Sequence, residues 1–276
     1  MTQSWPPDEL TGEERLAAVD TTVANPARIW DYWVGGKDNF AADREAAQAV
    51  MAALPSMPAL ARRTRLFLTD AVRQLAADRG IRQFLDIGTG LPTADNTHEV
   101  AQRAAPESRI VYVDNDPVVL THAQALLTSS RAGKTDYLYA DLRDTGRILA
   151  GAARTLDFSQ PVAVLILSVL HFVSDEEGPG EIVAGFTDRL APGGCLVISA
   201  ITSDGVDEGT AAGAADLYRA ARTPAVARSG EQMAAYFAGC DLVEPGLVSL
   251  VKWRPDAGTS SRQTQVHMLA GVGRKR

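Results

Sequence analysis

The chain has 276 residues, of which 46% are hydrophobic and 22% are charged, and its formal net charge is −7 at pH 7. This acidic balance argues against a nucleic-acid partner, because binding phosphates requires clustered lysine and arginine side chains. The two cysteines, Cys195 and Cys240, form no C-x-x-C motif, so the sequence indicates neither a disulfide framework nor a bound metal.

The length suits one α/β domain with an added helical segment better than two separate cores. The chain opens without a hydrophobic signal sequence, and its longest apolar run, residues 161–170, is too short to cross a bilayer. We therefore expect a cytoplasmic protein without a membrane partner. The sequence leaves the oligomeric state open, and a homo-oligomer is compatible with it.

Residues 1–79 are expected to form a helical cap. Asn25 as N-cap and Pro26 in the first turn predict a helix that stops at the pair Gly35-Gly36, and Gly80 would end the last helix of the segment. The basic residues of that last helix are interspersed with acids, a pattern typical of a solvated helix face. The three helices are predicted over residues 26–34, 39–54 and 58–80.

From residue 80 onward, short β-rich runs alternate with helical stretches, which indicates right-handed βαβ crossovers and a doubly wound, mostly parallel sheet. Five strands are expected at residues 81–87, 109–114, 135–140, 161–168 and 194–200. The helices between them are expected near residues 96–105, 116–129, 144–153 and 178–190. Two last strands, at residues 247–253 and 264–272, would form an antiparallel pair. The sequence therefore predicts an α/β domain with a seven-stranded sheet over residues 80–276.

The run FLDIGTG, residues 84–90, places a D-x-G-x-G motif at the end of the first predicted strand. Gly88 and Gly90 would let the backbone approach a ligand closely, although a simple tight turn is the alternative. The motif is not the dinucleotide fingerprint G-x-G-x-x-G, because Thr93 occupies the third glycine position. Asp86, just before the turn, therefore points to a nucleoside ligand without a pyrophosphate.

Acidic residues also follow the next two predicted strands. Asp114, at the tip of the second strand, would accept hydrogen bonds from both hydroxyls of a ribose, whereas Asp116 is expected to cap the following helix. Asp141, after the third strand, would reach the amino group of an adenine. A solvent-facing acid is the alternative for Asp114, and one of Asp141 and Asp144 would serve only as a helix cap.

His171 follows the fourth predicted strand, in the run SVLHF at residues 168–172. Ligands of open α/β sheets bind at the carboxyl edge where such a strand ends. Because the pKa of histidine lies near neutrality, His171 is a candidate general base. A hydrogen-bonded structural histidine is the alternative that its apolar neighbours favour.

Three acids after three successive strands, with an antiparallel pair closing the sheet, resemble a class I S-adenosylmethionine-dependent methyltransferase over residues 80–276. The resemblance narrows to an actinobacterial methyltransferase family long known as a domain of unknown function. The segments that carry it are PARIWDYWVGGKDNFAADRE, FLDIGTGLPTADNTHEV, VYVDNDPVVL, YADLRD and PVAVLILSVLHFVSD. It implies the fold and the cofactor, S-adenosylmethionine, but little about the methyl acceptor. Trp33-Val34 departs from the expected Leu-Leu, which concerns packing.

Position by position, the resemblance also implies which residues would hold the cofactor. Those implied for the methionine portion are Asp86, Gly88, Gly90 and Ser168. Those implied for the adenosine portion are Asp114 at the ribose hydroxyls and, at the adenine, Asn115, Asp141 and Leu142.

A methyltransferase chiefly needs an oriented acceptor in a water-poor pocket, because the sulfonium methyl group is already electrophilic. We therefore expect methyl transfer from S-adenosylmethionine to O, N or C of a small molecule, with His171 and Tyr32 as candidates for contact with the acceptor. One alternative is a non-catalytic S-adenosylmethionine-binding protein. Another is an NAD(P)-dependent oxidoreductase, which the missing third glycine disfavours.

The segment WDYWVGGKDNF, residues 30–40, gathers aromatic residues around a glycine pair. In a fold of this class it is a candidate lid, with Tyr32 facing the methionine portion of the cofactor and Lys37 or Arg28 meeting its carboxylate. A packing joint between the first two helices is the alternative, since aromatic side chains in helices mostly pack against other helices.

Overall fold

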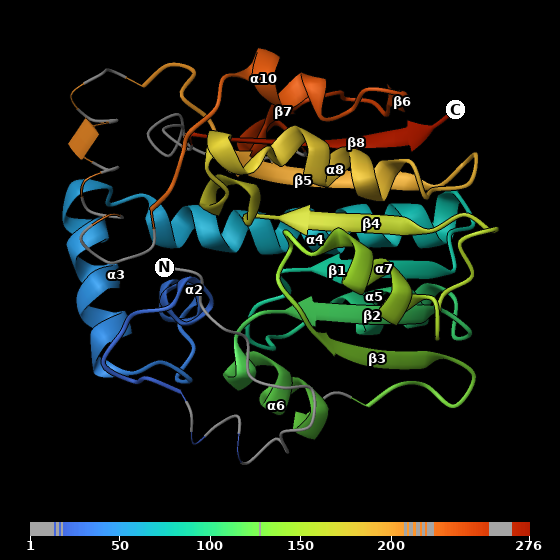
Figure 1. Cartoon of the computed structure of the whole chain (residues 1–276), viewed down its shortest axis with the longest axis horizontal. Helices are drawn as coiled ribbons and strands as arrows, with labels where there is room; N and C mark the ends of the chain where they lie inside the picture. The colour runs from blue at the N-terminus through green and yellow to red at the C-terminus, as the bar shows by residue number, and fades with distance from the viewer. Residues whose placement is uncertain are drawn as a thin grey trace.

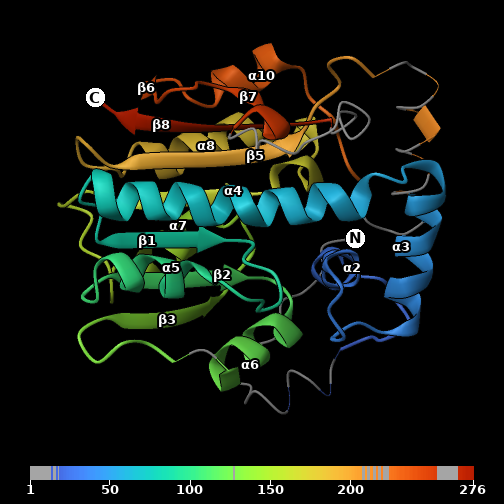
Figure 2. The same ribbon diagram turned by 180° about the vertical axis from the view of Figure 1, so that it is seen from behind.

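A central β-sheet with helices on both faces forms the framework of the molecule, as the computed structural model shows (Figures 1 and 2). The structure describes residues 14, 17, 19–126, 128–206, 209, 212, 213, 216, 219, 224–253 and 267–276. None of the helices in these ranges combines the length and the apolar character that a membrane-spanning helix requires.

The sheet has eight strands in the order β3-β2-β1-β4-β5-β8-β6, with β7 also paired to β8. The strands are β1 (Gln83–Ile87), β2 (Arg109–Asp114), β3 (Lys134–Tyr139), β4 (Ala163–Leu167), β5 (Cys195–Ile201), β6 (Cys240–Leu242), β7 (Val248–Ser249) and β8 (Met268–Lys275). Strands β1 to β5 are parallel, and β8 runs antiparallel to β5, β6 and β7. The predicted parallel sheet with antiparallel C-terminal strands is thereby confirmed.

The helices alternate with the strands as the sequence predicts. They are α2 (Pro26–Val34), α3 (Ala41–Ala53), α4 (Met57–Asp78), α5 (Thr97–Ala104), α6 (Pro117–Leu126), α7 (Thr145–Ala152), α8 (Pro179–Thr187) and α10 (Gly230–Ala235). The short 3-10 helices are η1 (Leu170–Phe172), η2 (Asp175–Glu177) and η3 (Leu250–Lys252). Helices α7 and α8 cover the face seen in Figure 1, and α4 and α5 cover the face seen in Figure 2.

The C-terminal part departs from the prediction in its details. Of the strand predicted over residues 247–253, only the two residues of β7 are extended, and η3 follows directly. The first residues of the predicted strand 264–272 lie outside the described ranges, while β8 continues to Lys275. Strand β6 is the eighth strand, beyond the seven that the sequence predicts. It has three residues, of which one is buried, so its sequence shows no alternation of apolar and polar residues.

Helix α2 begins and ends where the sequence predicts. The Asn25 side chain accepts a hydrogen bond from the backbone N–H of Ala27 at 2.8 Å, which makes Asn25 the N-cap. Gly35 has a φ of 92°, and its N–H donates to the carbonyl of Tyr32. Both views place α2 and α3 beyond the carboxyl ends of the parallel strands, so they face the edge where ligands of such sheets bind (Figures 1 and 2).

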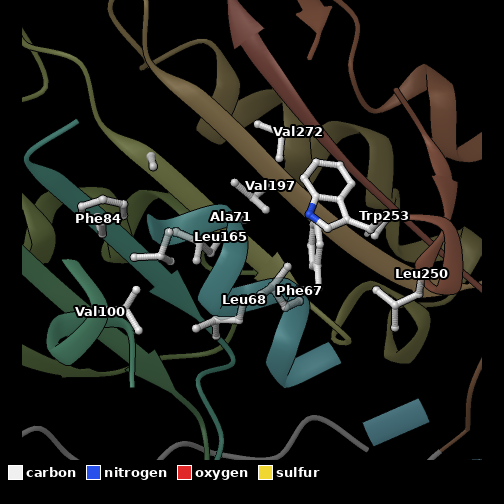
Figure 3. Packing of buried hydrophobic residues seen from close by; sticks show 14 of the residues in the cluster. Phe67, Leu68, Ala71, Phe84, Val100, Leu165, Val197, Leu250, Trp253 and Val272 are labelled. Carbon is white, nitrogen blue, oxygen red and sulfur yellow. The ribbon is translucent and has the colours of Figure 1, made fainter. Parts of the chain in front are cut away.

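Helix α4 packs its apolar side on the sheet, where it shares a core cluster with β1, β4, β5 and β8 (Figure 3). The rings of Phe67 and Trp253 meet edge to face, with their centroids 4.8 Å apart. Phe67 is 2% exposed, whereas its neighbour Leu66 is 54% exposed. The same turn of α4 therefore offers a buried position and an exposed one for comparison.

We expect the substitution Phe67→Ala to lower the free energy of unfolding by about 3–5 kcal/mol, because it removes a buried ring and leaves a cavity against Trp253. Leu66→Ala is the matched control and should change the free energy by about 0.5 kcal/mol or less. Urea unfolding followed by circular dichroism measures both. Equal losses for the two variants would contradict this packing.

Candidate functional site

A cavity of about 980 Å³ lies at the carboxyl edge of the parallel strands. The segments after β1, β2, β3 and β4 line it on one side, and residues of α2 and α4 line it on the other. Because β1 pairs with both β2 and β4, the strand order reverses at this point. Such a reversal is the usual ligand site of an open α/β sheet.

The turn after β1 depends on its two glycines. Gly88 and Gly90 have φ values of 69° and 68°, in the left-handed region that favours glycine. A Cβ atom at Gly88 would also collide with the side chain of Val169. The N–H of Gly88 donates to the carbonyl of Val113 at 2.8 Å, which fastens the turn to β2.

Asp114, at the end of β2, holds two turns together. Its Oδ2 accepts a hydrogen bond from the N–H of Gly90, and its Oδ1 accepts one from the N–H of Asp116, both at 2.9 Å. The side chain lines the cavity although the residue is only 5% exposed. Burial raises the pKa of this carboxyl to about 7, so the group changes charge near neutral pH.

Asp116 caps α6, as the sequence predicts, and also pairs with α2. Its Oδ1 accepts a hydrogen bond from the N–H of Val118 at 2.9 Å, and its Oδ2 lies 3.5 Å from Nε of Arg28. Arg28 also lies 3.4 Å from Asp43 and over the ring of Phe40. Arg28 lines the cavity, but two protein carboxylates already compensate its charge. The Nε and Nη1 atoms of Arg28 have no hydrogen-bond partner among the described residues, so the binding of a cofactor carboxylate by Arg28 stays a prediction.

Asp141 and Leu142 line the cavity after β3, as predicted for residues at the adenine. Asn115 donates to Oδ2 of Asp141 at 2.9 Å, and Arg143 donates to Oδ1 through both its backbone N–H and its side chain. Asp144 is the N-cap of α7, because its side chain accepts from the N–H of Arg147. Of these two acids, only Asp141 faces the cavity.

Ser168 and His171 follow β4 but lie in different surroundings. Ser168 lines the cavity and has a φ of 58°, a conformation that costs energy in a residue with a side chain. His171 is 2% exposed and does not line the described cavity. Burial, with a smaller effect from Arg228, lowers the pKa of His171 to about 3. At neutral pH this imidazole is a weak base, which speaks against the predicted general-base role.

Helix α2 turns one side to the cavity and the other to α3. The residues of α2 that line the cavity follow helical spacing and are Pro26, Ala27, Arg28, Trp30, Asp31 and Val34. Tyr32 instead accepts a hydrogen bond from Gln48 of α3 at 3.1 Å, and Lys37 is exposed. Trp33 donates to the carbonyl of Ala47. Trp30 and Asp31 are thus among the described residues that line the cavity, whereas Tyr32 and Lys37 are not.

The segment after α2 wraps around the Asp31 side chain. Oδ2 of Asp31 accepts hydrogen bonds from the N–H of Asp38 at 3.0 Å and from the Asn39 side chain at 2.8 Å. A Cβ atom at Gly36 would collide with the Asp31 carboxylate, so a larger residue there would displace this carboxylate. Burial raises the pKa of Asp31. The contacts of Tyr32 and Trp33 with α3 agree with the predicted packing joint, whereas the lid stays a prediction.

The sequence analysis misses the contribution of α4, whose Thr64, Arg65 and Leu68 also line the cavity. It treats the basic residues of this helix as a solvated face, although Arg65 borders the buried stripe that includes Leu60 and Phe67. The helical spacing of that stripe is the signal that identifies this side of α4 as facing inward.

Comparisons with known proteins give a consistent result. The family model described as S-adenosyl methyltransferase matches residues 12–276. The chain is similar to a solved structure of a DUF574 family protein from Streptomyces avermitilis MA-4680, with 42% identity, a TM-score of 0.89, and coverage of 93% of this chain and 99% of that chain. It is also similar to a structure from Thermobifida fusca YX described as a putative methyltransferase, with 38% identity, a TM-score of 0.85, and coverage of 93% and 97%.

A more distant likeness concerns the fold alone. An O-methyltransferase family protein from Burkholderia thailandensis has 16% identity and a TM-score of 0.50, with coverage of 83% of this chain and 62% of that chain. A comparison with the curated proteins finds no match.

The pairing of Arg28 with two acids predicts a role in stability. Arg28→Met should lower the free energy of unfolding by about 3–5 kcal/mol, because it leaves the buried carboxylates of Asp43 and Asp116 without a counter-charge. Arg62→Met, at an exposed position of α4, is the control and should change it by about 0.5 kcal/mol or less. Chemical denaturation measures both variants. A stable Arg28→Met protein would contradict this assignment.

Proposed function

We propose, from the premise that this chain belongs to the S-adenosyl methyltransferase family, that it methylates a small molecule bound beside the cofactor in the cavity. Family membership makes the chain an S-adenosylmethionine-dependent methyltransferase. We further propose which residues hold the cofactor and which class of molecule accepts the methyl group.

The polar groups of the cavity suit the cofactor. Asp114 would accept hydrogen bonds from the ribose hydroxyls, and Asp141, held by Asn115, would meet the adenine. Gly88 leaves room for close approach, and Ser168 would contact the methionine portion. When bound, S-adenosylmethionine supplies an electrophilic methyl group, so the chain has to orient the acceptor and exclude water.

The observation that carries this proposal is the placement of Asp114. Its carboxylate is buried at the point where the strand order reverses, and it already fixes the glycine turn through Gly90. A buried carboxylate gains from further donors, and a pair of ribose hydroxyls supplies two. The absence of a third glycine, with Thr93 in its place, fits a nucleoside without pyrophosphate.

The size and walls of the cavity support a small-molecule acceptor. Its volume of about 980 Å³ is near the upper end of the range of roughly 300–1,000 Å³ that is usual for a single ligand, which leaves room beside the cofactor. Trp30 and Val34 of α2, Leu68 of α4 and Phe172 after β4 give it an apolar wall. In this proposal these side chains position the acceptor and keep water out.

Because the pKa of the Asp114 carboxyl is about 7, we expect cofactor binding to depend on pH. Ribose hydroxyls donate to the ionised carboxylate, so binding should lower its pKa from about 7. Above pH 7 the group is ionised in both states and the Kd should be constant. Below pH 7 the free protein carries a proton that binding must release, so the Kd should rise by up to about tenfold per pH unit.

Isothermal titration with S-adenosylhomocysteine at about pH 6 and about pH 8 measures this dependence. Asp114→Asn should bind weakly and with little change between the two pH values, because the titrating group is gone. A wild-type Kd that is equal at both pH values would contradict the role of Asp114.

Methyl transfer itself is tested with S-adenosylmethionine labelled in its methyl group. The protein should label a member of a panel of small phenols, amines and carbon acids. Gly88→Ala is the matched background and should lose more than about tenfold in cofactor affinity, since the added Cβ collides with Val169 and the turn has a positive φ. Label found on protein or nucleic acid but on no small molecule would contradict the proposed acceptor class.

A further inference from the structure

Among the described residues, three arginines line the cavity, and their charges are compensated differently. Arg28 pairs with Asp43 and Asp116, and Arg143 pairs with Asp141 and Glu177. Arg65 of α4 has no carboxylate within 4 Å in the ranges that the structure describes.

The contacts of Arg65 leave most of its donors available. Its Nη2 donates to the backbone carbonyls of Ala94 and Asp95, at 3.3 and 3.2 Å. A guanidinium has five N–H donors and stays protonated in proteins, and burial lowers the pKa of this one. Arg65 is half-buried, and a partly desolvated cation without a counter-ion is unfavourable, so an anion bound at this end of the cavity would be stabilised.

Asp86 provides the opposite charge at the same end of the cavity. Oδ2 of Asp86 accepts hydrogen bonds from the hydroxyls of Thr97 at 2.6 Å and Thr89 at 3.4 Å. Its other oxygen, Oδ1, has no hydrogen-bond partner among the described residues. The charges of Asp86 and Arg65 influence each other, yet the two groups form no ion pair. A cation and an anion that face one cavity without touching suit a zwitterionic ligand.

We propose that Arg65 binds the α-carboxylate of the cofactor's methionine portion, while Asp86 faces its α-ammonium group. This inference rests on the proposed function. It assigns to α4 the role predicted for Arg28 or Lys37. Arg28 is already neutralised by two acids, and Lys37 lies outside the cavity lining. A planar guanidinium also matches a carboxylate through two parallel hydrogen bonds.

The assignment is tested by removing the arginine side chain and the ligand carboxylate, separately and together, and comparing the Kd values. The Kd values of S-adenosylmethionine, decarboxylated S-adenosylmethionine and methylthioadenosine are measured by titration on the wild type and on Arg65→Met. On the wild type, loss of the ligand carboxylate should weaken binding about 10- to 100-fold, as expected for a lost hydrogen bond between charged groups. On Arg65→Met, the first two ligands should bind with nearly equal Kd.

Two measurements separate this role from a structural one. Methylthioadenosine lacks the amino-acid group, so its Kd should be the same on the wild type and on Arg65→Met. Arg73→Met is the matched control on the same helix, where the arginine pairs with Asp70 at 3.5 Å, and should leave all three Kd values unchanged.

The outcomes distinguish the two proposals. If the wild type binds decarboxylated S-adenosylmethionine as tightly as S-adenosylmethionine, Arg65 does not bind the carboxylate, and this comparison needs no variant. An equal loss of affinity for all three ligands in Arg65→Met would likewise overturn the assignment in favour of a structural role. A wild type that binds none of the three ligands would overturn the proposed function itself, and this inference with it.

Discussion

The buried carboxylate of Asp114 is the contact on which the rest of the cavity depends. One of its oxygens holds the glycine turn after β1 and the other holds the turn that starts α6. From there Asp116 continues to Arg28 of α2, and Arg28 continues to Asp43 of α3. Hydrogen bonds and ion pairs thus connect the sheet edge to the helices that cover it. The N-terminal helices are thereby fixed relative to the strand ends.

This arrangement places several carboxyl groups among buried residues. Four aspartates are each 5% exposed or less, and burial raises the pKa of all four: Asp31, Asp86, Asp114 and Asp116. Such groups reduce the stability of the free protein unless they find partners. In the proposed function, the cofactor supplies part of the missing hydrogen bonds and charges. Binding would therefore stabilise the folded chain, as any ligand specific for the native state does.

Residues whose environment follows from the strand pattern could be predicted from the sequence. Asp86, Asp114 and Asp141 end successive parallel strands, and the carboxyl ends of such strands meet at one edge, so the cavity gathers them. Helix faces could not be assigned in the same way, because the side of α2 that faces the cavity depends on where α3 packs. Tyr32 and Lys37 lie outside the cavity lining, whereas Trp30 and Arg65 belong to it. The burial of His171, which lowers its pKa and speaks against a general base, is likewise not visible in the sequence.

A crystal structure of the protein with S-adenosylhomocysteine would test the role of Asp114. We expect the ribose hydroxyls within hydrogen-bond distance of Asp114, the adenine beside Asp141, and Arg28 still paired with Asp43 and Asp116. A ribose bound away from Asp114, or an Arg28 released from its acids to hold the ligand, would contradict it.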